Sequence, residues 1–147
     1  MNARELGAMT QVLLIEPDSL VRGTVASVCR DMALVRIIQA TNLTQGEQYL
    51  QSQPVHGIMI SLAEGNSSLD LLNRLRERAF PCDPAIPVVV MASGCTKEQA
   101  VRLKALAVRR LLLQPFRMRD VVHTVEQIWP PAATAAAQRT ASNPAFF

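Results

Sequence analysis

Short apolar runs alternate along the chain with longer segments in which apolar residues recur every three or four positions. A short run that is apolar throughout is typical of a strand buried on both faces of a sheet. The expected strands are residues 12–15, 34–38, 57–60, 88–91 and 111–113. The longer segments predict amphipathic helices, at residues 20–32, 44–51, 69–75, 97–106 and 118–129. The pattern is therefore a strand–helix unit repeated five times.

Residues at the helix boundaries support this division. Asp18 or Ser19 can cap the first helix, and Ser67 or Ser68 can cap the third. Residues 96–99, Thr-Lys-Glu-Gln, fit a capping box at the start of the fourth helix. Strands that alternate with helices predict a parallel sheet with helices on both faces and right-handed crossovers.

Arginines inside the predicted elements indicate which positions face water. Arg36 interrupts the second apolar run, which favours an edge position for that strand. Arg74, Arg76 and Arg78 are expected on or near the outer face of the third helix, opposite its leucines.

A chain of 147 residues is most simply one domain. We expect that domain at residues 11–129, after a lead-in at residues 1–10 and before an Ala/Pro-rich tail at residues 130–147. The aromatic pair Phe146 and Phe147 in the tail is either a docking peptide or a disordered end.

Composition excludes several classes of protein. Hydrophobic residues make up 49% and charged residues 18%, a globular and not a disordered balance. No apolar run reaches the roughly 18 residues of a membrane span, and no apolar signal core opens the chain, so we expect a cytoplasmic protein. Cys29, Cys82 and Cys95 are odd in number and lack metal-site spacing, which favours reduced thiols.

The net charge of +3 is unevenly distributed along the chain. Residues 1–69 carry four basic and six acidic side chains, whereas residues 70–147 carry eleven basic and six acidic ones. This asymmetry suits an acidic protein surface, an anionic nucleotide or a nucleic acid, or simply a solvated basic face. Aromatic residues are only 4% of the chain, so nucleic acid is the less favoured partner.

Four of the expected strands end at short segments that contain polar residues. These are Glu16-Pro17-Asp18, Ser61, Ala92-Ser93 and Gln114-Pro115. The carboxyl ends of parallel strands meet over one crevice, and ligands bind there in α/β proteins. A crevice that held a metal and accepted a phosphoryl group would need clustered carboxylates and a cation, and these positions supply few of them.

The order and spacing of these pieces resemble the receiver domain of bacterial response regulators, from about Val12 to Ile128. The resemblance is strongest from Leu14 through Arg22, at the strand ending in Ser61, and at Gln114-Pro115-Phe116 before the last helix. It implies a three-layer (βα)5, flavodoxin-like fold, a doubly wound parallel five-stranded sheet of strand order 2-1-3-4-5. It also implies a chemistry: an aspartate after the third strand takes a phosphoryl group, assisted by magnesium, a hydroxyl residue and a lysine.

Matched position by position, the sequence departs from that chemistry. The acceptor falls on Ser61, and no Asp occurs between Asp31 and Asp70. The remaining positions are Glu16 and Pro17 for the metal-binding acids, Ala92 for the hydroxyl with Ser93 next to it, Gln114 for the lysine and Leu111 for the switch aromatic. We therefore expect a pseudo-receiver that is not an enzyme and has neither a metal nor another cofactor. Gln114 and Pro115 could still be joined by the cis peptide common in this family.

The expected function is that of a stand-alone receiver acting by protein–protein interaction in two-component or phosphorelay signalling. A kinase, a regulator, an output protein or a second copy would bind the face of the fourth helix, fifth strand and fifth helix; no membrane is involved. The basic residues of that face are Lys97, Arg102, Lys104, Arg109, Arg110, Arg117 and Arg119. The alternative is a cyclic-dinucleotide sensor, which the Arg-x-x-Asp spacing of Arg117 and Asp120 suggests, or a nucleic-acid-binding regulator.

Overall fold

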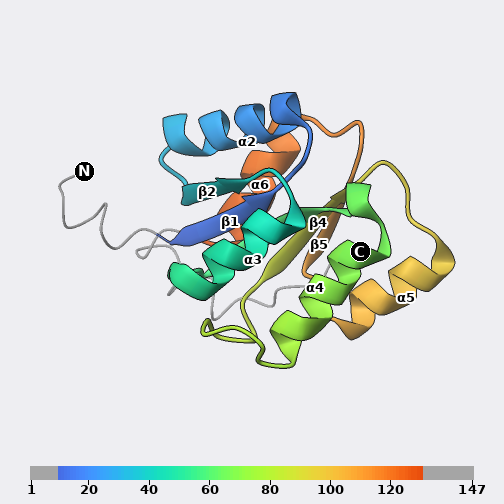
Figure 1. Ribbon diagram of the computed structural model, residues 1–147. Helices are drawn as coiled ribbons and strands as arrows, with labels where there is room; N and C mark the ends of the chain where they lie inside the picture. Colours follow the sequence, from blue (N-terminus) through green and yellow to red (C-terminus); the bar gives the residue numbers. More distant parts are fainter. Residues whose placement is uncertain (1–9, 131–147) are drawn as a thin grey trace, which may run out of the picture.

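The computed structural model describes residues 10–130, in which five strands alternate with helices (Figure 1). The strands are β1 (Gln11–Ile15), β2 (Arg36–Ala40), β3 (Gly57–Ser61), β4 (Val88–Ala92) and β5 (Arg110–Leu113). The helices are α2 (Ser19–Asp31), α3 (Leu43–Ser52), α4 (Asn66–Arg76), α5 (Lys97–Ala105) and α6 (Met118–Ile128), with a 3-10 turn, η1, at Leu62–Glu64. The repeated strand–helix unit is therefore confirmed.

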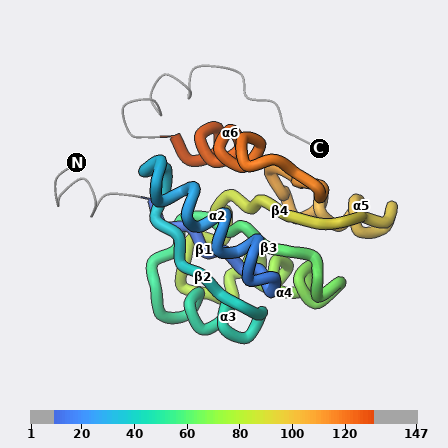
Figure 2. The backbone as a smooth tube through the Cα atoms, turned by 90° about the horizontal axis from the view of Figure 1, so that it is seen from above, coloured from blue at the N-terminus to red at the C-terminus, as the bar shows by residue number. Residues whose placement is uncertain are grey.

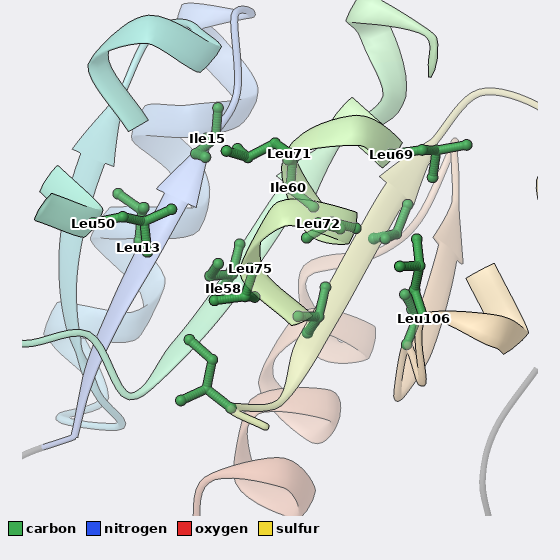
Figure 3. Close-up of a cluster of buried hydrophobic side chains, with 14 of the residues drawn as sticks. Leu13, Ile15, Leu50, Ile58, Ile60, Leu69, Leu71, Leu72, Leu75 and Leu106 are labelled. Carbon is green, nitrogen blue, oxygen red and sulfur yellow. The ribbon is translucent and has the colours of Figure 1, made fainter. Parts of the chain in front are cut away.

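The five strands form one parallel sheet in the order β2-β1-β3-β4-β5, as expected. Helices α2 and α6 cover one face, and α3, α4 and α5 cover the other (Figure 2). Successive residues of a strand point to opposite faces. Leu13 and Ile15 accordingly join the core under α3 and α4 (Figure 3), whereas Val12 and Leu14 join the core under α2 and α6.

Two boundary predictions were wrong. The second strand begins at Arg36 instead of residue 34, because the Leu34 N–H donates to the Cys29 carbonyl and closes the end of α2. Helix α4 begins at Asn66 after Gly65, whose φ of 65° suits glycine, and no serine side chain caps it. The buried Ser68 hydroxyl instead donates to the carbonyl of Ser61, 2.8 Å away.

Other local predictions are confirmed. Asp18 caps α2, and the capping box at Thr96 is formed with Gln99. β2 is an edge strand, and the Gln114–Pro115 peptide is cis. All three cysteines lie in the described part as free thiols, and burial raises the pKa of Cys29 to about 11.

The predicted tail beyond residue 130, including Phe146 and Phe147, lies outside the described residues. Within residues 10–130, no helix has both the length and the apolar character that a membrane span requires.

Candidate functional site at the carboxyl ends of the strands

A cavity of about 200 Å³ lies over the carboxyl ends of β1, β3, β4 and β5. It is lined by Glu16, Asp18, Ser61, Leu62, Ala63, Ala92, Ser93, Gly94 and Gln114. Six of the eight positions singled out in the sequence therefore border one space. The other two do not line it: Pro17 is exposed, and Leu111 packs partly buried against the core under α4.

Backbone pairing brings these positions together. The Glu16 N–H donates to the Ala40 carbonyl at 3.0 Å, which carries the β1–β2 pairing one residue past the strand. Ser61 is in register with Met91 at the ends of β3 and β4. The Gln114 N–H donates to the Ala92 carbonyl at 2.7 Å, which places the start of the β5–α6 connection beside the end of β4.

Glu16 is the most buried polar group of the cavity, with 2% of its surface exposed. Its Oε2 accepts from the Asp18 N–H at 3.0 Å, while its Oε1 has no hydrogen-bond partner among the described residues. Burial, and secondarily the negative charge of Asp18, raises the pKa of Glu16 above its ordinary value of 4.5. Hydrogen bonding from the Asp18 N–H, the charge of Arg22 and Ser61 act in the opposite direction without cancelling the effect of burial.

The two charged neighbours of Glu16 are engaged with the backbone. Asp18 Oδ1 accepts from the N–H groups of Leu20 and Val21, at 2.9 and 3.0 Å, and so caps α2. The Arg22 guanidinium donates to the main-chain carbonyls of Glu16 and Pro17, at 2.7 and 3.3 Å. Asp18 and Arg22 therefore fix the β1–α2 turn.

Ser61, which the sequence pattern matches to the phospho-acceptor position of a receiver, is the last residue of β3. Its Oγ accepts from the Ala63 N–H at 3.0 Å and caps the η1 turn, and its carbonyl accepts from the Ser68 hydroxyl. No described histidine lines the cavity; its carboxylates are Glu16 and Asp18. The arrangement gives Ser61 a structural task at the end of β3.

No model of a known protein family matches the chain, and no curated protein is significantly similar to it. Solved structures are similar in fold. A CheY-like response regulator receiver domain protein from Methanospirillum hungatei superimposes with a TM-score of 0.73 at 10% identity, covering 90% of this chain and 98% of that one. The receiver protein from Pseudoalteromonas atlantica gives 0.69 at 23% identity, covering 80% and 95%. The beryllofluoride-activated receiver domain dimer of NtrC4 gives 0.71 at 15% identity, covering 82% and 97%.

The chain has the receiver fold. The resemblance noted in the sequence is thus confirmed for the fold, including the parallel strand order 2-1-3-4-5.

The magnesium ion that the receiver fold implies does not fit the residues present. A hard divalent cation needs several charged oxygens around it. Here Glu16 offers one oxygen not already hydrogen-bonded, Asp18 has one oxygen committed to the helix cap, and Ser61 is a neutral hydroxyl. Within residues 10–130, no group of three or more Asp, Glu, His or Cys side chains is placed to share a metal.

The second predicted site, the basic face of α5, β5 and α6, is only partly as expected. Lys97, Val101 and Lys104 follow helical spacing on α5 and are all exposed. Arg102, in contrast, pairs with Asp70 of α4 at 3.0 Å. Of the other predicted members, Arg109 and Arg110 are half-buried, and Arg117 and Arg119 are exposed.

The Arg-x-x-Asp motif has a local structural role. The carboxylate of Asp120 accepts from the Arg117 N–H at 3.0 Å, at the first turn of α6. The spacing that suggested a nucleotide site is therefore explained by helix capping, and it lends no weight to that alternative.

Sequence reasoning placed Arg76 on the outer face of its helix, and this was wrong. Its guanidinium is half-buried and donates to the carbonyls of Leu106, Pro84 and Ile86, each at 2.8 Å. It thereby ties the α4–β4 connection to the end of α5. Two cues in the sequence were available: the position one residue after Leu75, and the proline-rich connection that offers many carbonyls and few N–H groups.

Proposed function

We propose that this chain is a pseudo-receiver: it keeps the receiver fold, does not accept a phosphoryl group, and acts in the cytoplasm by binding another protein of a two-component or phosphorelay pathway. The observation that carries the proposal is what the side-chain oxygens around the carboxyl-edge cavity contact. Those of Asp18 and Ser61 serve as backbone caps, and Glu16 is buried with one oxygen unpaired. Neither a nucleophile nor a metal cage remains for phosphotransfer.

Electrostatics supports the same conclusion for the product of such a reaction. A phosphoryl group at Ser61 would bring negative charge next to Glu16 and Asp18. Gln114 lies at the end of β5 where a receiver would place its lysine, and a carboxamide can donate a hydrogen bond but carries no charge to offset that repulsion. The cavity is therefore unsuited to the phosphorylated state as well as to the transfer.

The proposed partner surface is the exposed part of α5. Val101 is 68% exposed and stands between Lys97 and Lys104 in the helical repeat, which gives an apolar centre with basic neighbours. Such a surface suits a partner that presents an apolar patch within an acidic rim. Charge complementarity of this kind mainly raises association rates and makes them salt-sensitive.

The decisive experiment is incubation of the full chain with acetyl phosphate and Mg²⁺, followed by intact mass spectrometry, with a phosphorylatable receiver run in parallel. We expect no adduct on this chain and full conversion of the parallel receiver. Beryllofluoride with Mg²⁺ should likewise leave its amide NMR spectrum unchanged. Stoichiometric labelling at any carboxylate would overturn the proposal.

Stepwise restoration tests whether the missing groups are the cause. Ser61→Asp alone should remain unlabelled, because the metal-binding acid and the lysine are still absent. Ser61→Asp combined with Pro17→Asp and Gln114→Lys should gain measurable labelling. If Ser61→Asp alone were labelled to completion, the electrostatic explanation would be wrong.

The partner surface has its own test. Affinity capture with the full chain is followed by association-rate measurements with the captured signalling protein over a salt series. The double variant Lys97→Glu/Lys104→Glu should slow association at least tenfold at low salt. The matched control is Arg30→Glu/Arg36→Glu, on exposed positions of α2 and β2, which makes the same change in net charge away from α5. Equal effects of the two variants would contradict the assignment.

A further inference from the structure

The carboxyl-edge cavity is lined mainly by hydrogen-bond acceptors. Five of its nine lining residues carry side-chain oxygens: Glu16, Asp18, Ser61, Ser93 and Gln114. Two of these five are carboxylates, and no Lys, Arg or His within residues 10–130 lines the cavity. A ligand for this space would therefore be a donor with positive charge.

Glu16 is the cavity residue whose hydrogen bonding is incomplete. It lines the cavity with only 2% of its surface exposed. Its Oε2 accepts from the Asp18 N–H, but its Oε1 has no hydrogen-bond partner among the described residues. A buried acceptor without a donor destabilises a protein, and a charged one does so more strongly. The missing group at this point is a donor.

The nearby basic side chain does not supply that donor. The Arg22 guanidinium donates to the main-chain carbonyls of Glu16 and Pro17 and not to the carboxylate. Its charge lowers the pKa of Glu16, but burial has the larger effect and keeps that pKa above 4.5. The described surroundings thus leave the negative charge of Glu16 incompletely compensated, and a cation beside it would be stabilised.

The size of the cavity limits what can enter. Its volume of about 200 Å³ is below the roughly 300–1,000 Å³ of pockets for drug-sized ligands. A water molecule takes up about 30 Å³ in the liquid. The end of a side chain or a short amine therefore fits together with a few waters, whereas a drug-sized ligand does not.

Among small cations, a primary ammonium matches these acceptors best. A hard metal ion needs several charged oxygens at once, and the cavity does not offer them. An ammonium has three N–H donors and no acceptor, and its hydrogen bond to a carboxylate is about twice as strong as a neutral one. One donor would serve Glu16, and the others could serve the side-chain oxygens of Ser93 or Gln114, or water.

We propose that the carboxyl-edge cavity binds one primary ammonium group, with the carboxylate of Glu16 as its main acceptor. The group belongs to a small amine or to a lysine side chain of a partner protein, and both sources present the same end to the cavity. This site goes beyond the proposed function, because it requires neither phosphotransfer nor a partner on α5.

The test is amide NMR on the full 147-residue chain during titration with n-butylammonium chloride at constant ionic strength. Saturable shifts are expected at the backbone amides of Ala63 and Gly94 and at the side-chain amide of Gln114. Tetramethylammonium has the same charge but no N–H donor, and it should give no saturable shift. Titration with Nα-acetyl-lysinamide separates the two sources: saturation by n-butylammonium alone favours a small amine, and saturation by both favours a lysine side chain.

Substitutions test the assigned acceptor. Glu16→Gln keeps the shape of the side chain and should weaken n-butylammonium binding at least tenfold. Glu64→Gln, at an exposed carboxylate of η1 outside the cavity lining, is the matched control and should leave the affinity unchanged. Ser93→Lys places an ammonium at an exposed lining position and should block the probe, whereas Ser67→Lys, exposed but outside the lining, should not.

The outcomes separate this site from the proposed function. Shifts that do not saturate with n-butylammonium, equal saturation by tetramethylammonium, or an unchanged affinity in Glu16→Gln would each overturn the ammonium site and leave the pseudo-receiver proposal intact. Saturable shifts of the same signals with MgCl₂ would contradict both, because they would show that the cavity holds a divalent metal ion.

Discussion

At the amino edge of the sheet the indole of Trp129 lies directly against the backbone of Gly57, whereas at the carboxyl edge Glu16 and Ser61 border a cavity of about 200 Å³. The first contact leaves no room for a single methyl group. The second region leaves a carboxylate oxygen buried without a partner. The amino edge is closely packed at this point, while the carboxyl edge holds a cavity bordered by polar side chains.

The two edges also differ in how the helices begin and end there. At the carboxyl edge, α2, α3 and α5 begin with side-chain caps from Asp18, Asn42 and Thr96. At the amino edge, α2, α4 and α5 are each followed by a residue with positive φ that is not glycine: Ala33, Arg78 and Ala107. These three helix starts therefore have preferred capping residues, whereas these three helix ends carry backbone strain that substitution can remove.

The largest effect is expected at Gly57. Gly57→Ala places a Cβ within 2.2 Å of the Trp129 ring, so the indole or the end of α6 must move. Overpacking of this kind costs about 3 kcal/mol of unfolding free energy, measured by urea denaturation with the tryptophan fluorescence of Trp129 as probe.

Gly23→Ala is the matched control. No atom lies within 4 Å of an added Cβ at Gly23, which sits inside α2. Alanine there should raise stability by about 0.5–1 kcal/mol. If Gly57→Ala were no more costly than Gly23→Ala, the close packing of the amino edge would be refuted.

A smaller loss is expected at Arg76, which holds the amino-edge connection. Arg76→Met removes the three 2.8 Å hydrogen bonds from a charged donor to the carbonyls of Pro84, Ile86 and Leu106 and a longer one to Ala107, at a cost of about 2 kcal/mol. Arg76→Lys should recover little of it, because an ammonium cannot reproduce the planar fork. Arg78→Met, at an exposed position, should change unfolding midpoints by much less, and equal losses would argue against the bridging role.

The repeated fold could be predicted because each strand and helix carries its own pattern. A continuous run such as Val88–Ala92 identifies a buried strand without knowledge of its neighbours, and Thr96 with Gln99 identifies a helix start from four residues. The start of the second strand could not be predicted in this way. Leu34 is apolar, but its N–H donates to the Cys29 carbonyl at the end of α2 and not to a neighbouring strand. The bridging role of Arg76 was not predicted for a related reason. Its partners are main-chain carbonyls, which every residue has, so the pattern of side chains does not indicate them.

The carboxyl-edge cavity could be predicted as a set of positions, since parallel strand ends must converge. The roles of the individual residues in the cavity could not be predicted from the sequence. That Ser61 caps a 3-10 turn and that Ser68 donates to its carbonyl depend on how residues 62–68 fold. The burial of Glu16, which raises its pKa, follows from β2 and β3 on either side of β1 and not from the residues next to it in sequence.

At the carboxyl edge, a substitution of the buried Glu16 is expected to raise the free energy of unfolding. Because the folded protein holds the Glu16 proton more tightly than the unfolded chain, the native state is favoured at pH below the ordinary value of 4.5 and loses stability as pH rises through the higher folded pKa. Glu16→Gln removes the titrating group, so its stability relative to the parent should rise with pH and exceed that of the parent at pH 7, by on the order of 1 kcal/mol. The difference should shrink towards pH 4, and Glu126→Gln, at an exposed position, should show no such trend. A parent protein that gains stability relative to Glu16→Gln as pH rises would contradict the burial argument.

The smallest predicted effect separates backbone strain from helix propensity with two alanines that lie two positions apart at the end of α5, Ala105 and Ala107. Ala107 has a φ of 57°, and the Val108 N–H after it donates to the Leu103 carbonyl, which closes α5 in the left-handed conformation. Glycine relieves that conformation, so Ala107→Gly should raise the unfolding free energy by roughly 0.5–1 kcal/mol. Ala105 is the last residue of α5, and Ala105→Gly should lower the free energy by a similar amount, because glycine is a poor helix former. Urea midpoints that move in opposite directions would locate the strain at the helix end; midpoints that fall in both variants would show that the amino edge carries no removable strain at Ala107.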